Sequence, residues 1–300
     1  MSTYIGIDLG GTNVRVSKVD EKGNILQTVK SNSYGDQGPE VVMPNLKNLI
    51  RQIDDYQLCE GIGMGVPGPV DTIRKVMTLS SNLPGFTEYP IAKELEDEFK
   101  MPVYVDNDAN VAGLAEALVG AGKLQPIVYY VTISTGIGGA LVVNGRVVSG
   151  KSGYAGEVGN LVIDKRREKV NHLNIGAVEC EASGTAIVRK ARAIFGEDKI
   201  RHAGDLFELA QNNNEEAIKL VDQMTTDLAY MFSYVGLICD PCVFVIGGGV
   251  MKSKEYFLPQ VVEKYKALVH PGMRNTPFVQ ALLDEPGVIG AAMLPVSMKG

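Results

Sequence analysis

The sequence predicts an α/β fold made of two related halves, and three features of its 300 residues support this. Short apolar strands alternate with stretches of helical apolar spacing, an order that is typical of α/β proteins. Both halves open with a strand, a glycine turn, a strand, a hairpin and a strand, starting at Tyr4 and again at Ile127. Hydrophobic residues make up 45% of the chain and charged residues 21%, as expected for a globular protein with a substantial core.

The first half opens with an apolar strand that enters the turn Gly10-Gly11. Strands are expected at 4–9, 14–19, 25–29, 61–66 and 103–105. Helices are expected at 40–56, 90–99 and 109–119, where apolar residues recur at helical spacing. The run from Gly120 to Pro126 combines glycines and a proline, and we predict the domain boundary there.

The second half repeats the opening and then becomes helical. After the strand 127–133, Ser134 to Gly139 form a glycine turn, and Asn144-Gly145 is a strong hairpin signal. Further strands are expected at 140–143, 146–148 and 242–246. Helices are expected at 185–195, 205–211, 215–239 and 287–294, and a helix-like segment follows the turn 247–249 and ends at 269. The residues 287–294 are mostly small, which suits a closely packed helix. The charged run 164–169 is most simply a solvated loop.

Composition and charge exclude several classes of protein. The net charge of −6 argues against a nucleic-acid surface, which normally carries a basic field. We expect no signal peptide, no membrane span and no membrane surface, because the chain lacks the apolar and basic runs that these need. The pair Cys239 and Cys242 lacks the further ligands of a zinc site, so we expect reduced thiols and a cytoplasmic protein.

Three glycine turns follow three apolar strands, at 10–11, 136–139 and 247–249. Consecutive backbone N–H groups in such turns can bind anions, and glycine lets the backbone approach a ligand closely. Together the turns favour a nucleotide polyphosphate bound between two domains. Asp8 stands beside the first turn, where a carboxylate suggests a metal carried by a phosphate. For this turn alone, the alternative is a tight β-hairpin without a ligand.

One further motif is a false match. Residues 145–152 fit the P-loop pattern G-x-x-x-x-G-K-[ST] letter for letter. A true P-loop follows a strand and opens a helix, whereas here the middle of the motif is strand-like and glycines follow it. We therefore do not assign a P-loop.

Asp108 is the sharpest candidate for chemistry. It follows an apolar strand at the start of a helix, where it could cap the helix or act as a general base. As a base it would accept the proton of a hydroxyl attacking phosphorus, with Asn107 fixing the sugar that carries this hydroxyl. Asn82, Glu157 and Glu179 lie near glycines at loops or element ends, as polyol-binding groups might, although each alone could be a surface residue.

Taken together, these residues resemble the ROK family of bacterial sugar kinases, within the actin/hexokinase-like superfamily. The resemblance covers essentially the whole chain. Its motifs are Asp8-Leu9-Gly10-Gly11-Thr12-Asn13, Val66-Pro67-Gly68-Pro69-Val70-Asp71, Asn107-Asp108-Ala109-Asn110, Ser134-Thr135-Gly136-Ile137-Gly138-Gly139, Gly156-Glu157-Val158-Gly159, Glu179 with Ala182-Ser183-Gly184, and Ile246-Gly247-Gly248-Gly249.

The resemblance implies an α/β, two-lobed actin/hexokinase-like (ribonuclease H-like) fold with a duplicated βββαβαβα core. Residues 1–119 with about 286–300 would form a small N-terminal lobe, and residues 120–285 a large C-terminal lobe. It also implies a homodimer that phosphorylates a hexose with ATP and Mg²⁺ in the cleft between the lobes. Glucose, modified at O6, is the first substrate, with fructose, N-acetylmannosamine, allose or a β-glucoside as alternatives.

Two other functions remain as alternatives to a kinase. A sugar-responsive repressor of the same family would carry a helix-turn-helix before the first strand, and we expect none ahead of residue 4. A non-catalytic sugar sensor or an actin-like assembly protein could use the nucleotide turns without phosphorylating a sugar.

The resemblance also assigns roles to residues, with Asp108 as the catalytic base. The sugar-binding positions are Gly65, Asn82, Asn107, Asp108, Glu157, Asn160 and Glu179. The nucleotide positions are Asp8, Gly10, Gly11, Thr12, Asn13, Thr135, Gly136, Gly138, Gly248 and Gly249. Asp8 would in addition hold Mg²⁺ through water.

One departure from the family concerns zinc. Many members hold a structural zinc with one histidine and three cysteines, but these positions here are Asn160, Val170, His172 and Ala177. These side chains cannot supply a tetrahedral nitrogen and sulfur site, so we expect a zinc-free protein. The family histidine also contacts the sugar, so Asn160 leaves the sugar preference open.

Overall fold

The computed structural model describes residues 2–298, and the chain divides into two units. The first contains Met1–Tyr130, Ala140–Gly156 and Ala281–Gly300, and the second contains Val131–Gly139 and Glu157–Gln280. The division therefore passes through two neighbouring strands of the second sheet, and the end of the chain returns to the first unit. The predicted lobe limits, at 119 and about 286, remain predictions.

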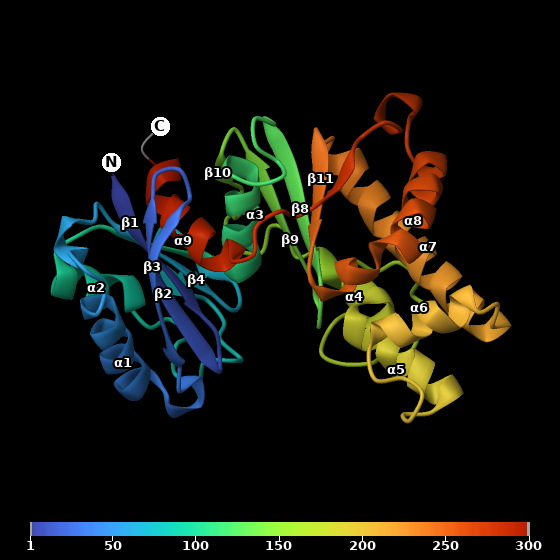
Figure 1. Ribbon diagram of the computed structural model, residues 1–300, viewed down its shortest axis with the longest axis horizontal. Coiled ribbons are helices and arrows are strands. Elements are labelled where there is room, and N and C mark those ends of the chain that lie inside the picture. Colours follow the sequence, from blue (N-terminus) through green and yellow to red (C-terminus); the bar gives the residue numbers. More distant parts are fainter. Residues whose placement is uncertain (1, 299–300) are drawn as a thin grey trace. The chain divides into compact units, whose positions relative to one another are not determined.

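The first unit is built on a five-stranded sheet with the order β3-β2-β1-β4-β7. Its strands are β1 (Thr3–Leu9), β2 (Asn13–Asp20), β3 (Ile25–Asn32), β4 (Ile62–Val66) and β7 (Val103–Asn107), with a small hairpin of β5 (Val70–Asp71) and β6 (Val76–Met77). The strands β1, β2 and β3 form an antiparallel meander, whereas β4 runs parallel to β1 and β7 parallel to β4. The helices are α1 (Pro39–Arg51), α2 (Ile91–Phe99), α3 (Asp108–Leu118) and α9 (Pro286–Ser297) (Figure 1).

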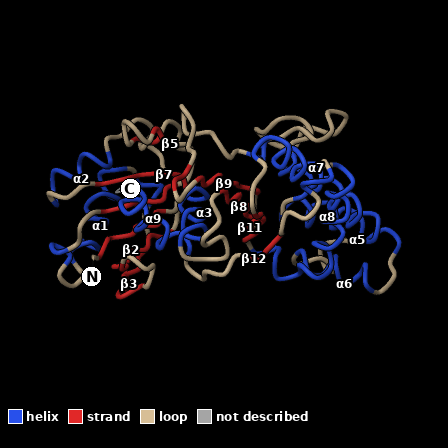
Figure 2. The backbone as a smooth tube through the Cα atoms, turned by 90° about the horizontal axis from the view of Figure 1, so that it is seen from above, coloured by secondary structure: helices blue, strands red, loops and turns tan. Residues whose placement is uncertain are grey.

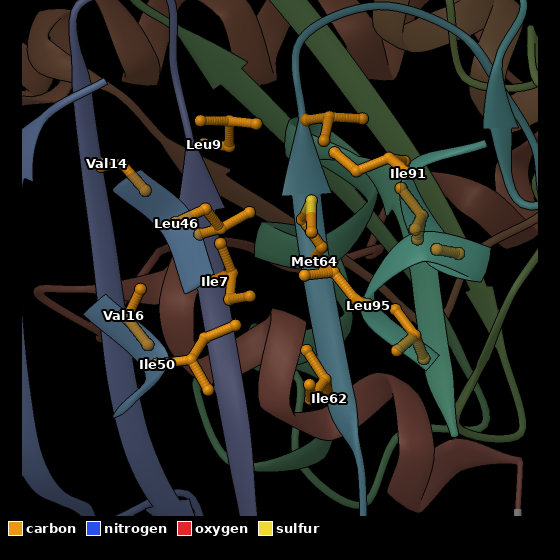
Figure 3. Packing of buried hydrophobic residues seen from close by; sticks show 14 of the residues in the cluster. Ile7, Leu9, Val14, Val16, Leu46, Ile50, Ile62, Met64, Ile91 and Leu95 are labelled. Carbon is orange, nitrogen blue, oxygen red and sulfur yellow. The ribbon is translucent and has the colours of Figure 1, made fainter. Parts of the chain in front are cut away.

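One face of this sheet packs on α1 and α2. Figure 3 shows Ile7 of β1 and Met64 of β4 in a buried cluster with Leu46 and Ile50 of α1 and Leu95 of α2. Each of these side chains is fully or almost fully buried, which stabilises the fold by ~1.5–3 kcal/mol per residue. The large apolar residues occupy alternate positions of each strand because successive side chains point to opposite faces.

The opposite face of the sheet carries glycines, and α9 packs closely on it. A Cβ atom on Gly6 would lie 2.0 Å from the carbonyl oxygen of Val288, and one on Gly63 would lie 1.7 Å from that of Ala291. A Cβ atom on Gly290 of α9 would lie 1.6 Å from the carbonyl oxygen of Val111 in α3. The prediction of a small, closely packed helix near the end of the chain is therefore confirmed.

The second sheet has the order β10-β9-β8-β11-β12 (Figure 2). Its strands are β8 (Ile127–Ile133), β9 (Ile137–Val143), β10 (Arg146–Val147), β11 (Val243–Gly247) and β12 (Phe278–Gln280). The two sheets have the same strand order: numbered by their position along the chain, the five strands of each sheet lie side by side as 3-2-1-4-5. The predicted duplication is therefore confirmed. Sequence periodicity missed β12, because it has only three residues and follows Pro277.

Helices α4 (Val178–Ala182), α5 (Gly184–Phe195), α6 (Ala203–Gln211) and α7 (Glu215–Cys239) stand between β10 and β11, and α8 (Lys254–Leu268) stands between β11 and β12. The limits of α7 match the prediction. Helix α1 does not: it was expected to reach residue 56 but ends at Arg51, and Asp55 then has a left-handed φ of 50°. Such a φ angle is incompatible with a right-handed helix.

The charged run 164–169 is a loop, as predicted, but it is not solvated throughout. The side chain of Arg166 is 87% exposed, whereas that of Arg167 is only 22% exposed and is paired with buried carboxylates. The sequence interpretation was therefore wrong for Arg167, because its partners, Glu181 and Asp227, lie far away along the chain.

The false P-loop is confirmed as a hairpin. Asn144 and Gly145 have φ angles of 50° and 74°, as in a tight turn between strands, and they join β9 to β10. Lys151 and Ser152 follow in a turn and do not begin a helix. Among the described residues, no helix combines the length and apolar character that crossing a bilayer requires.

Candidate functional site

The predicted base, Asp108, is the first residue of α3 and follows directly on β7. The adjacent Asn107 caps the helix: its Oδ1 accepts hydrogen bonds from the N–H groups of Ala109 at 2.8 Å and Asn110 at 3.4 Å. Its Nδ2 donates to the carbonyl of Gly68 at 3.0 Å. Asp108 is therefore not the cap, and its exposed carboxylate accepts a hydrogen bond from the N–H of Ala109 at 2.8 Å and another from the side chain of Asn107.

The pKa of Asp108 is raised above its ordinary value. The largest cause is desolvation by the protein around the carboxyl group, and the negative charge of Asp8 adds to it. The hydrogen bond from Ala109 acts in the opposite direction. Although solvent reaches the side chain, its carboxylate is thus a stronger base than a fully hydrated one.

Gly65 has a packing role beneath Asp108. It is buried in β4, and a Cβ atom there would lie 2.7 Å from Cγ2 of Val111 and 3.8 Å from the Cα of Asp108. Only a glycine lets the first turn of α3 approach the sheet this closely. The structure thus places this predicted sugar-binding residue directly below the predicted base.

Asp106, which the sequence interpretation missed, holds this region from below. Its Oδ1 accepts hydrogen bonds from the N–H of Asn107 and from Nδ2 of Asn110, both at 2.7 Å. Its Oδ2 accepts one from Oγ of Ser149, also at 2.7 Å. Burial raises the pKa of Asp106 despite these bonds. The available signal was a second carboxylate, directly after the apolar run 103–105 and two residues before Asp108.

Asp8, at the end of β1, belongs to a charged group. Nη1 of Arg15 lies 3.7 Å from Oδ2 of Asp8 and 2.8 Å from Oε2 of Glu285, and Nζ of Lys30 lies 3.2 Å from Oε1 of Glu285. Desolvation raises the pKa of Asp8, Arg15 lowers it, and Glu285 raises it. A Cβ atom on Gly287 would lie only 3.0 Å from the Asp8 carboxyl group, so α9 begins beside it.

The first glycine turn lies against the loop that carries Asn82. A Cβ atom on Gly11 would lie 2.9 Å from the carbonyl oxygen of Asn82, and the N–H of Gly10 donates to the carbonyl of Asn13 at 2.9 Å. Neither glycine has a positive φ, so close approach explains why Gly11 is a glycine. Thr12, Asn13 and Asn82 are all exposed, which leaves them accessible to a ligand.

In the second unit, Glu179 of α4 meets the second glycine turn. Its Oε2 accepts a hydrogen bond from the N–H of Ile137 at 2.8 Å, and a Cβ atom on Gly136 would lie 2.4 Å from the same oxygen. The N-terminus of α5 holds the turn from its other side. The N–H of Gly184 donates to the carbonyl of Ser134 at 2.8 Å, and Oγ1 of Thr185 donates to that of Thr135 at 2.5 Å.

The segment with Glu157 and Asn160 also lies near Glu179. A Cβ atom on Gly159 would lie 2.3 Å from the carbonyl oxygen of Ile137 and 3.2 Å from Oε2 of Glu179. Glu157 is exposed just before this glycine, whereas Oδ1 of Asn160 accepts a hydrogen bond from the N–H of Asn174 at 2.8 Å. The structure thus brings together the predicted sugar-binding residues of the second unit.

A cavity of about 1150 Å³ lies entirely within the second unit. The lining residues are Ser134, Thr135, Gly184, Thr185, Val188, Arg189, Arg192, Ala193, Glu197, Arg201, His202, Ala203, Gly204, Gly249, Val250, Lys252 and Ser253. Among them, three arginines and a lysine outnumber the single glutamate, which suits an anionic ligand. The basic residues of α5 and of the loop after it were missed by the sequence interpretation, because nothing local marks them as cavity residues.

Gly248 directly precedes Gly249, which lines this cavity. It has a φ of 92°, and a Cβ atom on it would lie 2.3 Å from the carbonyl oxygen of Ile133. Gly249 lines the cavity itself, and Gly138 lies in β9 beyond the turn. The glycines at 248–249 leave no side chain between the backbone and a ligand, which suits the base and ribose of a nucleotide. The basic lining of the cavity suits its phosphates.

Residues 2–298 contain no group of three or more His, Cys, Asp or Glu side chains placed to hold a metal ion. Mg²⁺ in nucleotide sites keeps several waters and uses one or two carboxylates with the substrate phosphates, so Asp8 alone is compatible with it. The absence of zinc remains a prediction.

Comparisons with known proteins agree on one family. The model of the ROK family matches residues 4–297. The chain is 30% identical to a glucokinase of Thermotoga maritima, with 97% of this chain and 96% of the relative covered. It also resembles the crystal structure of a ROK hexokinase from Thermus thermophilus, with 32% identity, a TM-score of 0.86 and 99% and 100% coverage. A ROK family glucokinase from Streptomyces griseus, solved with glucose and AMPPNP, gives 25% identity, a TM-score of 0.77 and full coverage of both chains.

Proposed function

The chain belongs to the ROK family and is an ATP-dependent sugar kinase, and from this premise we propose that it phosphorylates a hexose, first of all glucose, at O6. The similar glucokinase that was solved with glucose and AMPPNP supports both substrates. The proposal rests on Asp108: Asn107 caps the helix, so the Asp108 carboxylate is not used as the cap, and its raised pKa makes it a stronger base.

In the proposed reaction, Asp108 accepts the proton of the sugar hydroxyl as this oxygen attacks the γ-phosphorus of ATP. A positioned base of this kind contributes ~10²- to 10⁴-fold to the rate. Asp106 and Asn107 keep Asp108 in place, because they fix the start of α3 through hydrogen bonds to its backbone and to Asn110. The bond that breaks joins the γ-phosphorus to the bridging oxygen of ADP.

Sugar hydroxyls are assigned to Asn82, Asn107, Glu157, Asn160 and Glu179, with Gly65 below the base. Asn107 lies beside the proposed base: its Nδ2 donates to the carbonyl of Gly68, and its side chain also bonds to Asp108. Carboxylates such as Glu157 and Glu179 can each accept from two neighbouring hydroxyls, which suits a polyol.

The nucleotide is assigned to the cavity of the second unit, to the turn around Thr135, Gly136 and Gly138, and to Gly248 and Gly249. The turn from Gly10 to Asn13 supplies further backbone and hydroxyl donors for the phosphates. Asp8 would hold Mg²⁺ through water. Bound Mg²⁺ neutralises charge on the phosphates during phosphoryl transfer.

The identity of the sugar is tested by measuring the rate of ADP formation with glucose, fructose, N-acetylmannosamine, allose and a β-glucoside in turn. The proposal predicts the highest kcat/KM with glucose. A higher value with another member would replace glucose by that sugar. No turnover with any member, although sugar and ATP bind, would instead support a non-catalytic sugar sensor.

We further propose a cytoplasmic, zinc-free homodimer that needs neither nucleic acid nor membrane. Within the described residues all four cysteines are unpaired, as is usual in a reducing compartment. Elemental analysis of the purified protein tests for zinc, and light scattering after size-exclusion chromatography tests for the dimer. Bound stoichiometric zinc or a monomer at micromolar concentration would contradict these two points.

A further inference from the structure

Helix α4, which carries Glu179, is too short to hold its own orientation. It has only five residues, Val178–Ala182, and a helix of this length is marginal without tertiary contacts. Yet Glu179 must be well placed, because its Oε2 accepts the N–H of Ile137 at 2.8 Å. The contacts that fix α4 therefore determine where this carboxylate lies.

One long-range contact of α4 is an ion pair with Arg167. Its Nη1 lies 2.6 Å from Oε2 of Glu181 in α4, and its Nη2 lies 3.2 Å from Oδ1 of Asp227 in α7. The side chains of Glu181 and Asp227 are only 5% and 3% exposed. One planar guanidinium group thus joins a loop, α4 and α7, which a point charge on a lysine could not do with the same geometry.

Helix α5 holds α4 from its C-terminal end. Nζ of Lys190 donates to the carbonyl of Glu181 at 3.1 Å and also pairs with its carboxylate, and Nη2 of Arg189 donates to the carbonyl of Cys180 at 2.7 Å. They act together with the packing of the buried Val178, Cys180 and Ala182, and Arg167 adds the ion pairs that join α4 to α7. Within the described part of the chain, Oδ2 of Asp227 is buried without a hydrogen-bond partner, and its Oδ1 accepts one from Nε2 of Gln223 at 2.8 Å. The charge of Arg167 favours the ionised form of Asp227 more than this hydrogen bond does.

We propose that Arg167 is a positioning residue: its ion pairs with Glu181 and Asp227 fix α4 and thereby place Glu179 against Ile137 and toward the sugar. The placement against Ile137 stands on the contacts alone, whereas the effect on the sugar rests on the proposed function. Arg167 itself does not touch the substrate.

Amide hydrogen exchange at Ile137 tests the placement without any assay of activity. In Arg167→Met, the loss of orientation weakens the bond from Ile137 to Glu179, and we expect its exchange to accelerate about tenfold, as for a charge-assisted hydrogen bond. The matched control is Arg166→Met, since Arg166 is the neighbouring arginine, is 87% exposed and, among residues 2–298, has an ion pair only with Asp164. Its exchange at Ile137 should stay within about twofold of the wild type.

Steady-state kinetics test the effect on the sugar. In Arg167→Met we expect the KM for the sugar to rise about tenfold, with kcat within about threefold and the KM for ATP within about twofold. A merely structural role would lower the active fraction, and hence kcat, and leave both KM values unchanged. Arg166→Met should match the wild type in all three constants.

Arg167→Met removes the cation paired with the buried Asp227 and one of the two cations paired with the buried Glu181, so the variant can fail to fold. In that case Arg167→Met, Glu181→Gln and Asp227→Asn are combined, which removes the cation together with both buried charges. Unchanged exchange at Ile137 in a folded variant, or equal acceleration in Arg166→Met, would overturn the proposal. If the wild type phosphorylates no sugar but the exchange rates separate as expected, the proposed function fails and the positioning role stands.

Discussion

The two glycine turns follow equivalent strands of two sheets with the same order, but they are held in different ways. The first turn follows β1, and the Asp8 carboxylate of this strand belongs to a charged group with Arg15, Lys30 and Glu285. The second is held by hydrogen bonds, from Ile137 to Glu179 and from the start of α5 to Ser134 and Thr135. The repeated topology thus determines where each turn lies, whereas the contacts of each turn depend on the segments that pack around it.

Because the two turns are held differently, we expect variants of the two units to change different kinetic constants. The first unit contains the proposed base and the charged group that changes pKa values, so its variants should act mainly on kcat and on pH dependence. The second unit contains the cavity and the hydrogen-bonded carboxylate, so its variants should act mainly on KM and on stability.

The largest effect is expected for Asp108→Asn. The amide keeps the size of the side chain but cannot accept the proton, so kcat should fall by ~10²- to 10⁴-fold. Asp97→Asn, at an exposed position of α2, is the control and should leave kcat unchanged. Near wild-type turnover by a folded Asp108→Asn protein that binds both substrates would show that another group is the base.

The same variant should not be less stable. A carboxyl group whose pKa is raised on folding holds its proton more tightly in the folded state, so its ionisation costs stability as the pH rises through the folded pKa. Asp108→Asn removes this cost. Above that pH, chemical denaturation should therefore give a free energy of unfolding equal to or above that of the wild type.

A smaller effect, on stability, is expected in the second unit. Gly248→Ala places a Cβ atom at a φ of 92° and 2.3 Å from the carbonyl oxygen of Ile133. The left-handed backbone and the clash should lower the free energy of unfolding by at least ~2 kcal/mol. Gly249→Ala is the matched control, because a Cβ atom there meets Oγ of Ser134 only at 4.0 Å. Equal loss in both variants, measured by urea denaturation, would contradict this explanation.

Glu179→Ala and Glu179→Gln separate the two contacts of this carboxylate. Alanine removes the acceptor for the N–H of Ile137, whereas glutamine keeps a neutral acceptor. We expect the KM for the sugar to rise ~10-fold in both, and the KM for ATP to rise only with alanine, because only then is the turn released. A rise in the KM for ATP with glutamine as well would mean that the negative charge itself matters to the turn.

The smallest effect concerns Asp8. Its negative charge raises the pKa of Asp108, so Asp8→Asn should lower that pKa and move the acidic limb of the kcat/KM profile to lower pH, by less than ~1 unit. Glu285→Gln serves as a comparison, since it lowers the pKa of Asp8 without removing its charge. An acidic limb that stays in place in Asp8→Asn would show that the two carboxyl groups do not interact.

Much of the fold was predictable because its signals are local. Apolar runs ending in glycine turns marked β1, β8 and β11, and helical spacing gave the limits of α7. The same local signals placed Asp108 at a helix start. They could not decide between Asn107 and Asp108 as the cap, because both residue types favour that position and the choice depends on how β7 enters α3.

The sequence by itself determined the duplicated strand pattern, the glycine turns and the family, and it predicted Asp108 as a site residue, since each of these depends on neighbouring residues. The tertiary structure alone decided the partners of long side chains. Glu285 reaches Arg15 from the end of the chain, and Arg167 reaches Asp227 of α7 from a loop that looked solvated. Such pairs depend on which faces of distant elements pack together, and neither spacing nor residue type encodes that information locally.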